Sequence, residues 1–85
     1  MICAYILKSL KDGRRYIGCT SNLVKRLRYH NEGLVKSTRY RRPFKVIYPE
    51  EYETMKEAHL RELKLKSFKS GDIIRKLIVD YQTRE

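Results

Sequence analysis

The stretch RRYIGCTSNLVKRLRYHNEG, residues 14–33, decides the fold, because a strand-like segment runs directly into a helix-like one. Residues 15–20 combine Tyr, Ile and Thr, which favour strands. From residue 21 onward the apolar residues recur at helical spacing instead. We expect Ser21 to cap the N-terminus of this helix and Gly33 to end it, because Gly readily adopts the left-handed conformation that follows a helix.

The predicted helix carries a polar line beside an apolar edge. Asn22, Arg26 and His30 follow one another at intervals of four residues, so their side chains lie on one face. The apolar edge consists of Leu23, Val24 and Leu27. We therefore expect the helix to pack on a sheet through that edge and to present an Arg and a His together.

A second strand-like segment, residues 2–9, precedes the first, and an Asp-Gly pair lies between them. This pair predicts a hairpin with a two-residue turn. In the register of that turn Tyr5 faces Thr20, and Leu7 faces Gly18. Because alternate side chains share a face, one face of the hairpin includes Tyr5, Tyr16 and Gly18.

A third strand and a second helix are predicted further along the chain. The strand covers residues 44–53, in which alternate positions are apolar: Phe44, Val46 and Tyr48. Thr54 and Glu57 match a capping box, which starts a helix running to about Lys69.

A third helix follows, with apolar residues again at helical spacing: Ile73, Ile74, Leu77, Ile78 and Tyr81. The predicted element order is ββαβαα. We therefore expect a single α+β domain over residues 1–85, with a three-stranded antiparallel sheet flanked by helices.

The charge of the chain points to a polyanionic partner. Twenty Lys and Arg against ten Asp and Glu give a net charge of +10 on 85 residues. Nucleic acid is the first candidate, and an anionic membrane surface is the second. No apolar run is long enough to span a bilayer, and no secretory signal is evident, so we expect a cytoplasmic protein that does not enter the membrane.

The segment LVKSTRYRRP, residues 34–43, is the clearest candidate for contact with nucleic acid. It has no acidic residue, and an aromatic ring stands among its basic groups. Basic groups can bind the phosphate backbone, and the ring can stack on a base. The alternative is a solvated basic loop. The proposed contact residues are Lys36, Arg39, Tyr40, Arg41 and Arg42.

Glu62 is the carboxylate most in need of explanation. It shares the helical spacing of an apolar stripe with Met55, Ala58 and Leu65. A carboxylate on such a stripe is costly unless a positive group compensates it. One interpretation is a salt bridge to a neighbouring Arg. The other is a ligand for Mg²⁺ or a similar hard cation, for which one carboxylate with water and phosphate oxygens suffices.

The Cys and His residues give no metal-binding pattern along the sequence. Cys3 and Cys19 stand in strand-like segments, and the spacings of His30 and His59 do not match a zinc motif. We expect two half-buried reduced thiols and no disulfide framework. His59 is expected to be a surface residue.

These residues resemble the GIY-YIG nuclease domain along nearly the whole chain. Tyr16-Ile17-Gly18 matches the second half of the family name, and the segment of residues 3–5, CAY, keeps only the Tyr of the first half. The pattern is most similar to that of the small stand-alone bacterial members. The family Arg and His match Arg26 and His30, and the metal-binding Glu matches Glu62. Many members also have an Asn near the end of the domain, but Asn22 and Asn31 are the only Asn residues here.

The resemblance implies chemistry for these positions. A single divalent ion, Mg²⁺ or Mn²⁺, would be held by Glu62, and Arg26 would bind the scissile phosphate. Tyr5 would be the general base, with Tyr16 and His30 placing a water molecule or relaying its proton. Nearby cations are expected to favour ionisation of Tyr5. A Gly at the position of Gly18 is expected to leave room for substrate.

The function implied is a divalent-metal-dependent endonuclease that hydrolyses phosphodiester bonds in DNA, with RNA not excluded. Branched, nicked or damaged DNA is a candidate substrate, in repair or processing, and a protein partner is a candidate source of specificity. One alternative is a nucleic-acid-binding module without turnover, and another is a protein-interaction domain. The nuclease hypothesis requires Tyr5, Arg26 and Glu62 to converge on one pocket.

Overall fold

The computed structural model describes residues 1–68 and 71–84. Within these residues the chain forms the predicted three-stranded antiparallel sheet and three α-helices in the order ββαβαα. The strands are β1 (Cys3–Ser9), β2 (Arg15–Thr20) and β3 (Phe44–Glu51). The helices are α1 (Leu23–Asn31), α2 (Met55–Ser67) and α3 (Gly71–Gln82), with a short 3₁₀ turn, η1 (Arg39–Arg41).

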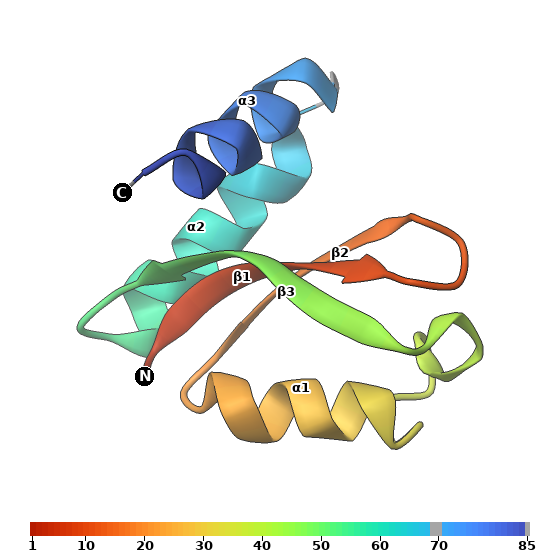
Figure 1. Ribbon diagram of the computed structural model, residues 1–85. Helices are drawn as coiled ribbons and strands as arrows, with labels where there is room; N and C mark the ends of the chain where they lie inside the picture. Colours follow the sequence, from red (N-terminus) through yellow and green to blue (C-terminus); the bar gives the residue numbers. More distant parts are fainter. Residues whose placement is uncertain (69–70, 85) are drawn as a thin grey trace.

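The sheet has the strand order β2-β1-β3 and lies between two helical layers. Figure 1 shows α1 on one face and α2 with α3 on the other. The α1 face covers a core cluster that includes Tyr5, Leu7 and Phe44. The opposite face covers a second cluster that includes Ile6 and Leu65. Strand β1 is therefore buried on both faces, whereas β2 is an edge strand with a helix on either side.

The predicted register of the β1–β2 hairpin is wrong by two residues. Tyr5 pairs with Gly18 and Leu7 pairs with Tyr16. The cause is Ser9, whose hydroxyl accepts hydrogen bonds from the backbone N–H groups of Lys11 and Asp12 and so stabilises a four-residue turn. Because the shift is an even number, the expected face is retained, and Tyr5, Tyr16 and Gly18 still lie on one side.

Strand β3 does not keep the simple alternation predicted for it, and it ends at Glu51 rather than at residue 53. A bulge opposite Ile6 and Leu7 places Ile6 against Tyr48 and Leu7 against Val46. Val46 therefore packs on the α1 side, while Tyr48 joins the cluster under α2 and α3. An inserted residue reverses which face the following side chains occupy.

Helix α1 begins one residue later than predicted. Asn22, rather than Ser21, is the N-cap, and its side-chain oxygen accepts from the Lys25 N–H at 3.1 Å. The helix stops at the predicted Gly33, which has φ of +79° and lies in the left-handed region. Asn22 is thus used for capping, and only Arg26 and His30 remain of the predicted polar line.

Helices α2 and α3 form as the sequence predicts. The capping box is present, with the Glu57 N–H donating to the Thr54 hydroxyl at 3.2 Å. Helix α2 ends at Ser67, and the predicted end at Lys69 lies outside the described residues. Helix α3 packs on the sheet through Ile74 and Ile78. Among the described residues, none of the helices has the length and apolar character needed to cross a bilayer.

Candidate active site

Tyr5 lies at the centre of the α1 side of the sheet. Its side chain is only 1% exposed, and its ring centroid lies 6.5 Å from that of Tyr16. The hydroxyl of Tyr5 lies 3.4 Å from His30 Nε2. The Arg26 guanidinium interacts with the hydroxyls of both tyrosines. Three of the predicted site residues therefore meet Tyr5: Tyr16 from β2, and Arg26 and His30 from α1.

His30 is fully buried among aromatic rings. Its ring centroid lies 4.9 Å from that of Tyr16 and 5.7 Å from that of Phe44. Burial, together with the charge of Arg26, lowers the pKa of His30 to about 4. The imidazole is therefore neutral at pH 7.

Thr38 is the hydrogen-bond partner of the other His30 nitrogen. The Thr38 hydroxyl lies 2.8 Å from His30 Nδ1 and 3.4 Å from the Val35 carbonyl oxygen. In the tautomer with the proton on Nδ1, this N–H donates to the Thr38 oxygen and the Nε2 lone pair faces the Tyr5 hydroxyl. Sequence reasoning missed Thr38, because no local pattern connects the loop after α1 with the helix interior.

Burial affects Tyr5 in the direction opposite to the predicted one. It raises the pKa of Tyr5 to about 12, although the hydrogen bond with Arg26 lowers it. The cations near Tyr5 are too few to offset the loss of hydration. The hydroxyl therefore keeps its proton at neutral pH and acts as a hydrogen-bond donor.

Gly18 makes room for Tyr5 rather than for an open substrate space. A Cβ atom at this position would lie 2.6 Å from the Tyr5 hydroxyl oxygen and 2.8 Å from the ring carbon that bears it. The two residues are directly paired across the hairpin. Any side chain here would displace the hydroxyl, so Gly18 sets the position of Tyr5.

Glu62 lies on the other side of β2 from these residues. Its side chain is 13% exposed, and it packs on β2 beside Cys19, the neighbour of Gly18 in the chain. The Cys19 thiol donates to Glu62 Oε1 at 3.0 Å, and Lys66 Nζ donates to Oε2 at 2.7 Å. The predicted salt bridge to an Arg is replaced by this pair with Lys66. Helix α2 thus directs Glu62 at the hairpin.

The charge of Glu62 links the two sides of β2. It acts on Tyr5, whose pKa it raises slightly further. Burial raises the pKa of Glu62 itself, but hydrogen bonds from Cys19 and Lys66 outweigh that effect and lower it. The carboxylate is therefore ionised at neutral pH. Tyr5, Tyr16, Arg26 and His30 meet directly, whereas Glu62 faces the other side of β2. Among the described residues, Tyr5, Arg26 and Glu62 therefore do not line a common cavity at β2.

The carboxylate fits the divalent ion that the family resemblance implies. An ionised carboxylate oxygen is a hard donor of the kind that Mg²⁺ and Mn²⁺ prefer. Glu62 would serve as the one protein ligand, with water and phosphate oxygens completing the coordination. Lys66 holds one of the two carboxylate oxygens and so orients the group.

Among the described residues, one cavity lies at β2 toward α1 and another lies at β2 toward the α2–α3 layer. The first, of about 320 Å³, lies between the end of β2 and the start of α1, and Arg26 lines it. The second, of about 400 Å³, lies between β2 and the α2–α3 layer, and Tyr16 and Lys66 line it. A nucleic-acid strand lying along the edge of β2 would pass both Arg26 and Lys66.

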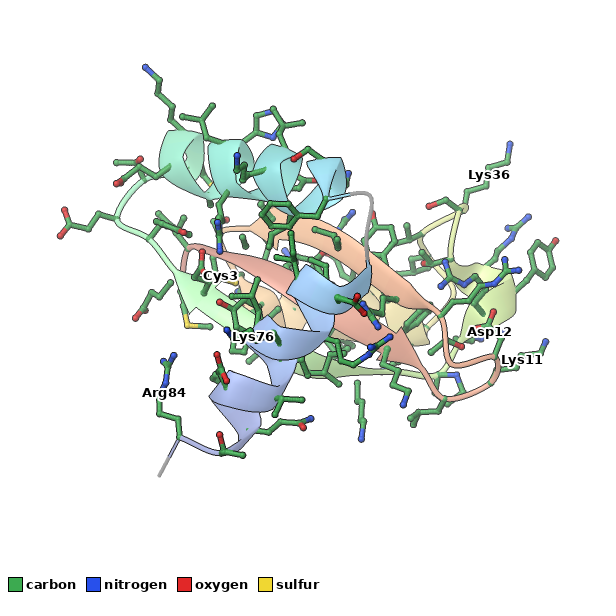
Figure 2. All side chains as sticks on the ribbon, turned by 90° about the horizontal axis from the view of Figure 1, so that it is seen from above. Cys3, Lys11, Asp12, Lys36, Lys76 and Arg84 are labelled. Atoms are coloured by element: carbon green, nitrogen blue, oxygen red, sulfur yellow. The ribbon has the colours of Figure 1, made fainter. Side chains whose placement is uncertain are left out.

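The predicted basic loop is only partly available for binding. Tyr40 is 73% exposed, and the Arg39 guanidinium carbon lies 5.1 Å from its ring centroid. Lys36 extends away from the body of the protein (Figure 2). Arg41, by contrast, is ion-paired with Asp12 at 3.3 Å and ties the loop to the hairpin. Arg42 is exposed and donates to the Arg39 carbonyl.

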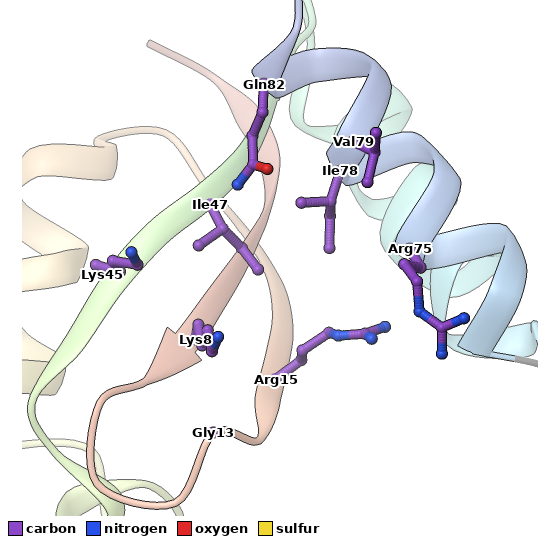
Figure 3. A pocket seen from close by; sticks show the side chains of 9 residues that line it. All are labelled: Lys8, Gly13, Arg15, Lys45, Ile47, Arg75, Ile78, Val79 and Gln82. Atoms are coloured by element: carbon purple, nitrogen blue, oxygen red, sulfur yellow. The ribbon is translucent and has the colours of Figure 1, made fainter.

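A second basic surface was missed by the sequence reasoning. Arg15, Lys8 and Lys45 are direct cross-strand neighbours, so three cations form a row across the sheet. Figure 3 shows this row at a cavity of about 270 Å³, with Arg75 of α3 beside it. Arg75 is paired with Asp72. Like charges placed directly opposite one another destabilise a sheet, which favours a bound anion. The row depends on strand register and has no local signal.

Neither Asn replaces the late Asn of the family. The Asn31 side chain donates to the Phe44 carbonyl at 3.1 Å and accepts from the Phe44 N–H at 2.6 Å. Asn22 caps α1. Both therefore have structural roles, one holding α1 to the start of β3 and the other starting the helix.

The fold and these residues identify the class of the protein. The family model of the GIY-YIG catalytic domain matches residues 1–71. The chain therefore belongs to the GIY-YIG family, as the resemblance predicted. Membership of this nuclease domain family supports a nuclease function.

The curated relatives are small bacterial proteins of the UPF0213 group. A UPF0213 protein of Clostridium perfringens is 48% identical over 63 residues, which are 73% of this chain and 67% of the relative. A UPF0213 protein of Staphylococcus saprophyticus is 42% identical over 65 residues, 75% of this chain and 78% of the relative. One from Bacillus pumilus is 43% identical over 65 residues, 75% and 65% of the two chains. No solved structure matches the chain significantly.

Proposed function

We propose that this protein is a divalent-metal-dependent endonuclease that hydrolyses phosphodiester bonds in DNA. One observation carries the proposal. Tyr5, Arg26 and His30 meet on one side of Gly18, and the ionised carboxylate of Glu62 lies on the other. A binding module needs a cationic surface, but it has no use for a buried phenol–imidazole pair beside a carboxylate.

Arg26 is the group that would bind the scissile phosphate. Its hydrogen bond with Tyr5 raises its pKa despite the opposing effect of burial, so the guanidinium is permanently charged. It also lines the cavity between β2 and α1. A planar guanidinium can donate two parallel hydrogen bonds to phosphate oxygens. The hydroxyls of Tyr5 and Tyr16 hold the Arg26 guanidinium in place. Less reorganisation would then be needed when negative charge develops on the phosphate.

Tyr5 and His30 would move the proton of the attacking water. The Tyr5 hydroxyl can donate to His30 Nε2 at 3.4 Å, so the phenolic oxygen can accept a proton from water as its own passes to the imidazole. The charge of Arg26 helps to keep His30 neutral, and a bound phosphate would offset that charge. The imidazole of His30 would therefore accept a proton more readily when substrate is bound. Tyr16 would help to place the water.

Glu62 would hold the divalent ion, Mg²⁺ or Mn²⁺. When bound, this ion supplies electrostatic stabilisation of the departing 3′-oxygen. The chain contributes an ionised carboxylate oriented by Lys66 and placed beside Gly18.

Two basic surfaces would bind the DNA backbone. One is the loop with Lys36, Arg39, Tyr40 and Arg42, and the other is the cross-strand row of Arg15, Lys8 and Lys45. Both surfaces would bind the phosphate backbone rather than base edges, so we expect weak sequence preference. Recognition of branched or nicked DNA, or a protein partner, would supply specificity in repair or processing.

Nicking of supercoiled plasmid and of branched DNA, with and without Mn²⁺, tests the proposal. Wild type should cut only with the ion, and Arg26→Ala and Glu62→Gln should each lose roughly 100-fold or more of the rate. Arg28→Ala is the matched control, because Arg28 lies on the same helix but is exposed and paired with Glu32. Equal rates in all four proteins would reveal a contaminating nuclease and overturn the proposal.

A measurement of DNA binding, made beside the nicking assay, separates the alternative functions. A protein that binds DNA in a salt-dependent manner but does not cut it with either ion would be a binding module. The two basic surfaces favour that alternative over a protein-interaction domain. A protein that binds no DNA would support the interaction domain instead.

A further inference from the structure

Three side chains with metal-ligating atoms meet on the α2 side of β2. Cys19 comes from the strand, and His59 and Glu62 come from neighbouring turns of the helix. Cys19 Sγ lies 3.0 Å from Glu62 Oε1 and 4.0 Å from His59 Nδ1, and His59 Nδ1 lies 3.3 Å from Glu62 Oε1. The three atoms thus form a small triangle.

The triangle has the size that a zinc ion requires. An ion just above the plane of the triangle would lie about 2.0–2.3 Å from the three atoms, which matches zinc bond lengths to N, O and S. The three donors are a thiol, an imidazole and a carboxylate, each a common zinc ligand. We propose that Cys19, His59 and Glu62 bind one Zn²⁺ ion and leave a fourth position open to solvent.

The surroundings of the triangle favour this ion. Glu62 uses Oε1 in the triangle, while Oε2 stays with Lys66 at 2.7 Å, so the carboxylate is already oriented by a second partner. A thiolate and a carboxylate together neutralise the two charges of the ion. Binding forms a Zn–S bond, and the thiol proton passes to solvent. His59 is 58% exposed, so an ion can enter from that side.

This site differs in chemistry from the hard-ion role proposed for Glu62. Thiolate and imidazole bind Zn²⁺ and Co²⁺ far better than Mg²⁺. Zn²⁺ would therefore bind all three side chains, whereas Mg²⁺ or Mn²⁺ would use the carboxylate alone. The two ions compete for one carboxylate, so bound zinc would prevent the proposed nuclease from taking up its working ion. Binding of zinc does not depend on nuclease activity, whereas this competition rests on the proposed function.

Titration of the metal-free protein with Co²⁺ tests the site, because cobalt replaces zinc and reports its ligands by absorption. We expect one Co²⁺ ion per chain and a thiolate-to-cobalt charge-transfer band. Addition of one equivalent of Zn²⁺ should remove this band. Cys19→Ser should abolish the charge-transfer band. His59→Gln should weaken Co²⁺ binding by more than the roughly 10–100-fold typical of losing an outer partner.

Cys3→Ala is the matched control, since it removes the other thiol and leaves Cys19 in place. It should keep the band. His59→Gln changes an exposed side chain, so its result does not depend on tolerance of a core substitution. Absence of a charge-transfer band in wild type, or a band unchanged in Cys19→Ser and His59→Gln, would overturn the inference. A band without any nicking activity would leave the zinc site standing and remove the nuclease.

If nicking occurs, each variant can be compared with its own zinc-free rate. Equimolar Zn²⁺ should suppress Mn²⁺-dependent nicking in wild type by a larger factor than in His59→Gln. An equal factor in both proteins would contradict competition at Glu62.

Discussion

The two sides of β2 differ in how their polar groups meet water. On the α1 side Tyr5 and His30 are buried and uncharged at neutral pH, with pKa values of about 12 and about 4. On the α2 side the largely buried carboxylate of Glu62 forms an ion pair with Lys66, whose side chain is 50% exposed. Burial holds protons in defined positions, whereas exposure lets ions exchange. The proposed chemistry needs both, and the charge of Glu62 acts on Tyr5 across β2.

The largest effect on the nicking rate should come from a change on the α1 side of β2, at Tyr5. Tyr5→Phe removes only a hydroxyl, and we expect the nicking rate to fall by about 100-fold or more, as for loss of a general base. Tyr81→Phe, on α3 and away from the site, should cut like wild type. A Tyr5→Phe rate within twofold of wild type, measured on the same plasmid, would show that the buried phenol has no part in cleavage.

His30 should make stability depend on pH in a defined window. Its pKa in the folded protein, about 4, lies below the usual 6.5, so only the unfolded chain takes up this proton between those values. Stability should therefore fall as pH decreases from about 6.5 to 4, by roughly 3 kcal/mol from this group. Urea unfolding at pH 7 and pH 4.5 measures it.

His30→Gln supplies the reference for that measurement, because it cannot titrate there. It should be less stable than wild type at pH 7 but should lose less stability on acidification. Carboxylates titrate in both proteins, so the difference between the two isolates His30. Equal losses in both would mean that folding does not change the pKa of His30 and would remove the contrast between the two sides.

Gly18→Ala tests the close approach of Tyr5 to β2. The new methyl group would overlap the Tyr5 hydroxyl and ring, so we expect a loss of about 1–3 kcal/mol in unfolding free energy. Gly71→Ala is the matched control, since nothing lies within 4 Å of its Cβ position, and it should not destabilise the protein. Similar melting temperatures for both variants would show that Tyr5 can move away without cost.

The smallest effect is expected at the cross-strand row of cations. Lys8→Ala with Lys45→Ala should lower the slope of log affinity against log salt by roughly 2, as for loss of two phosphate contacts. Lys56→Ala with Lys76→Ala, on the exposed faces of the helices, should change the slope less. Fluorescence anisotropy with a short duplex measures both. If the Lys8→Ala, Lys45→Ala double variant has the same slope as wild type, the cross-strand row does not contact DNA. Binding would then be confined to the α1 side and its loop.

Local patterns predicted the elements but not their pairing. The Thr54–Glu57 box and Gly33 were identified because caps involve residues a few positions apart. The hairpin register was missed because the Ser9 hydroxyl, not the Asp-Gly pair, shapes the turn. The helix start was assigned to Ser21 although Asn22 makes the bond, since both residues are good caps. The bulge in β3 is another feature without a local signal.

The candidate site divides in the same way. Helical periodicity places Arg26 and His30 on one face, and strand alternation places Tyr5 with Tyr16 and Gly18, so the sequence was sufficient for these groupings. Three other groupings depend on the tertiary structure. They are the contact of Thr38 with His30, the cluster of Cys19 and His59 with Glu62, and the row of cations through Lys8. Their contacts join distant segments, and a shift of one residue in strand register would separate them. Burial likewise results from the whole fold, which is why the ionisation of Tyr5 departs from what its neighbouring charges predict.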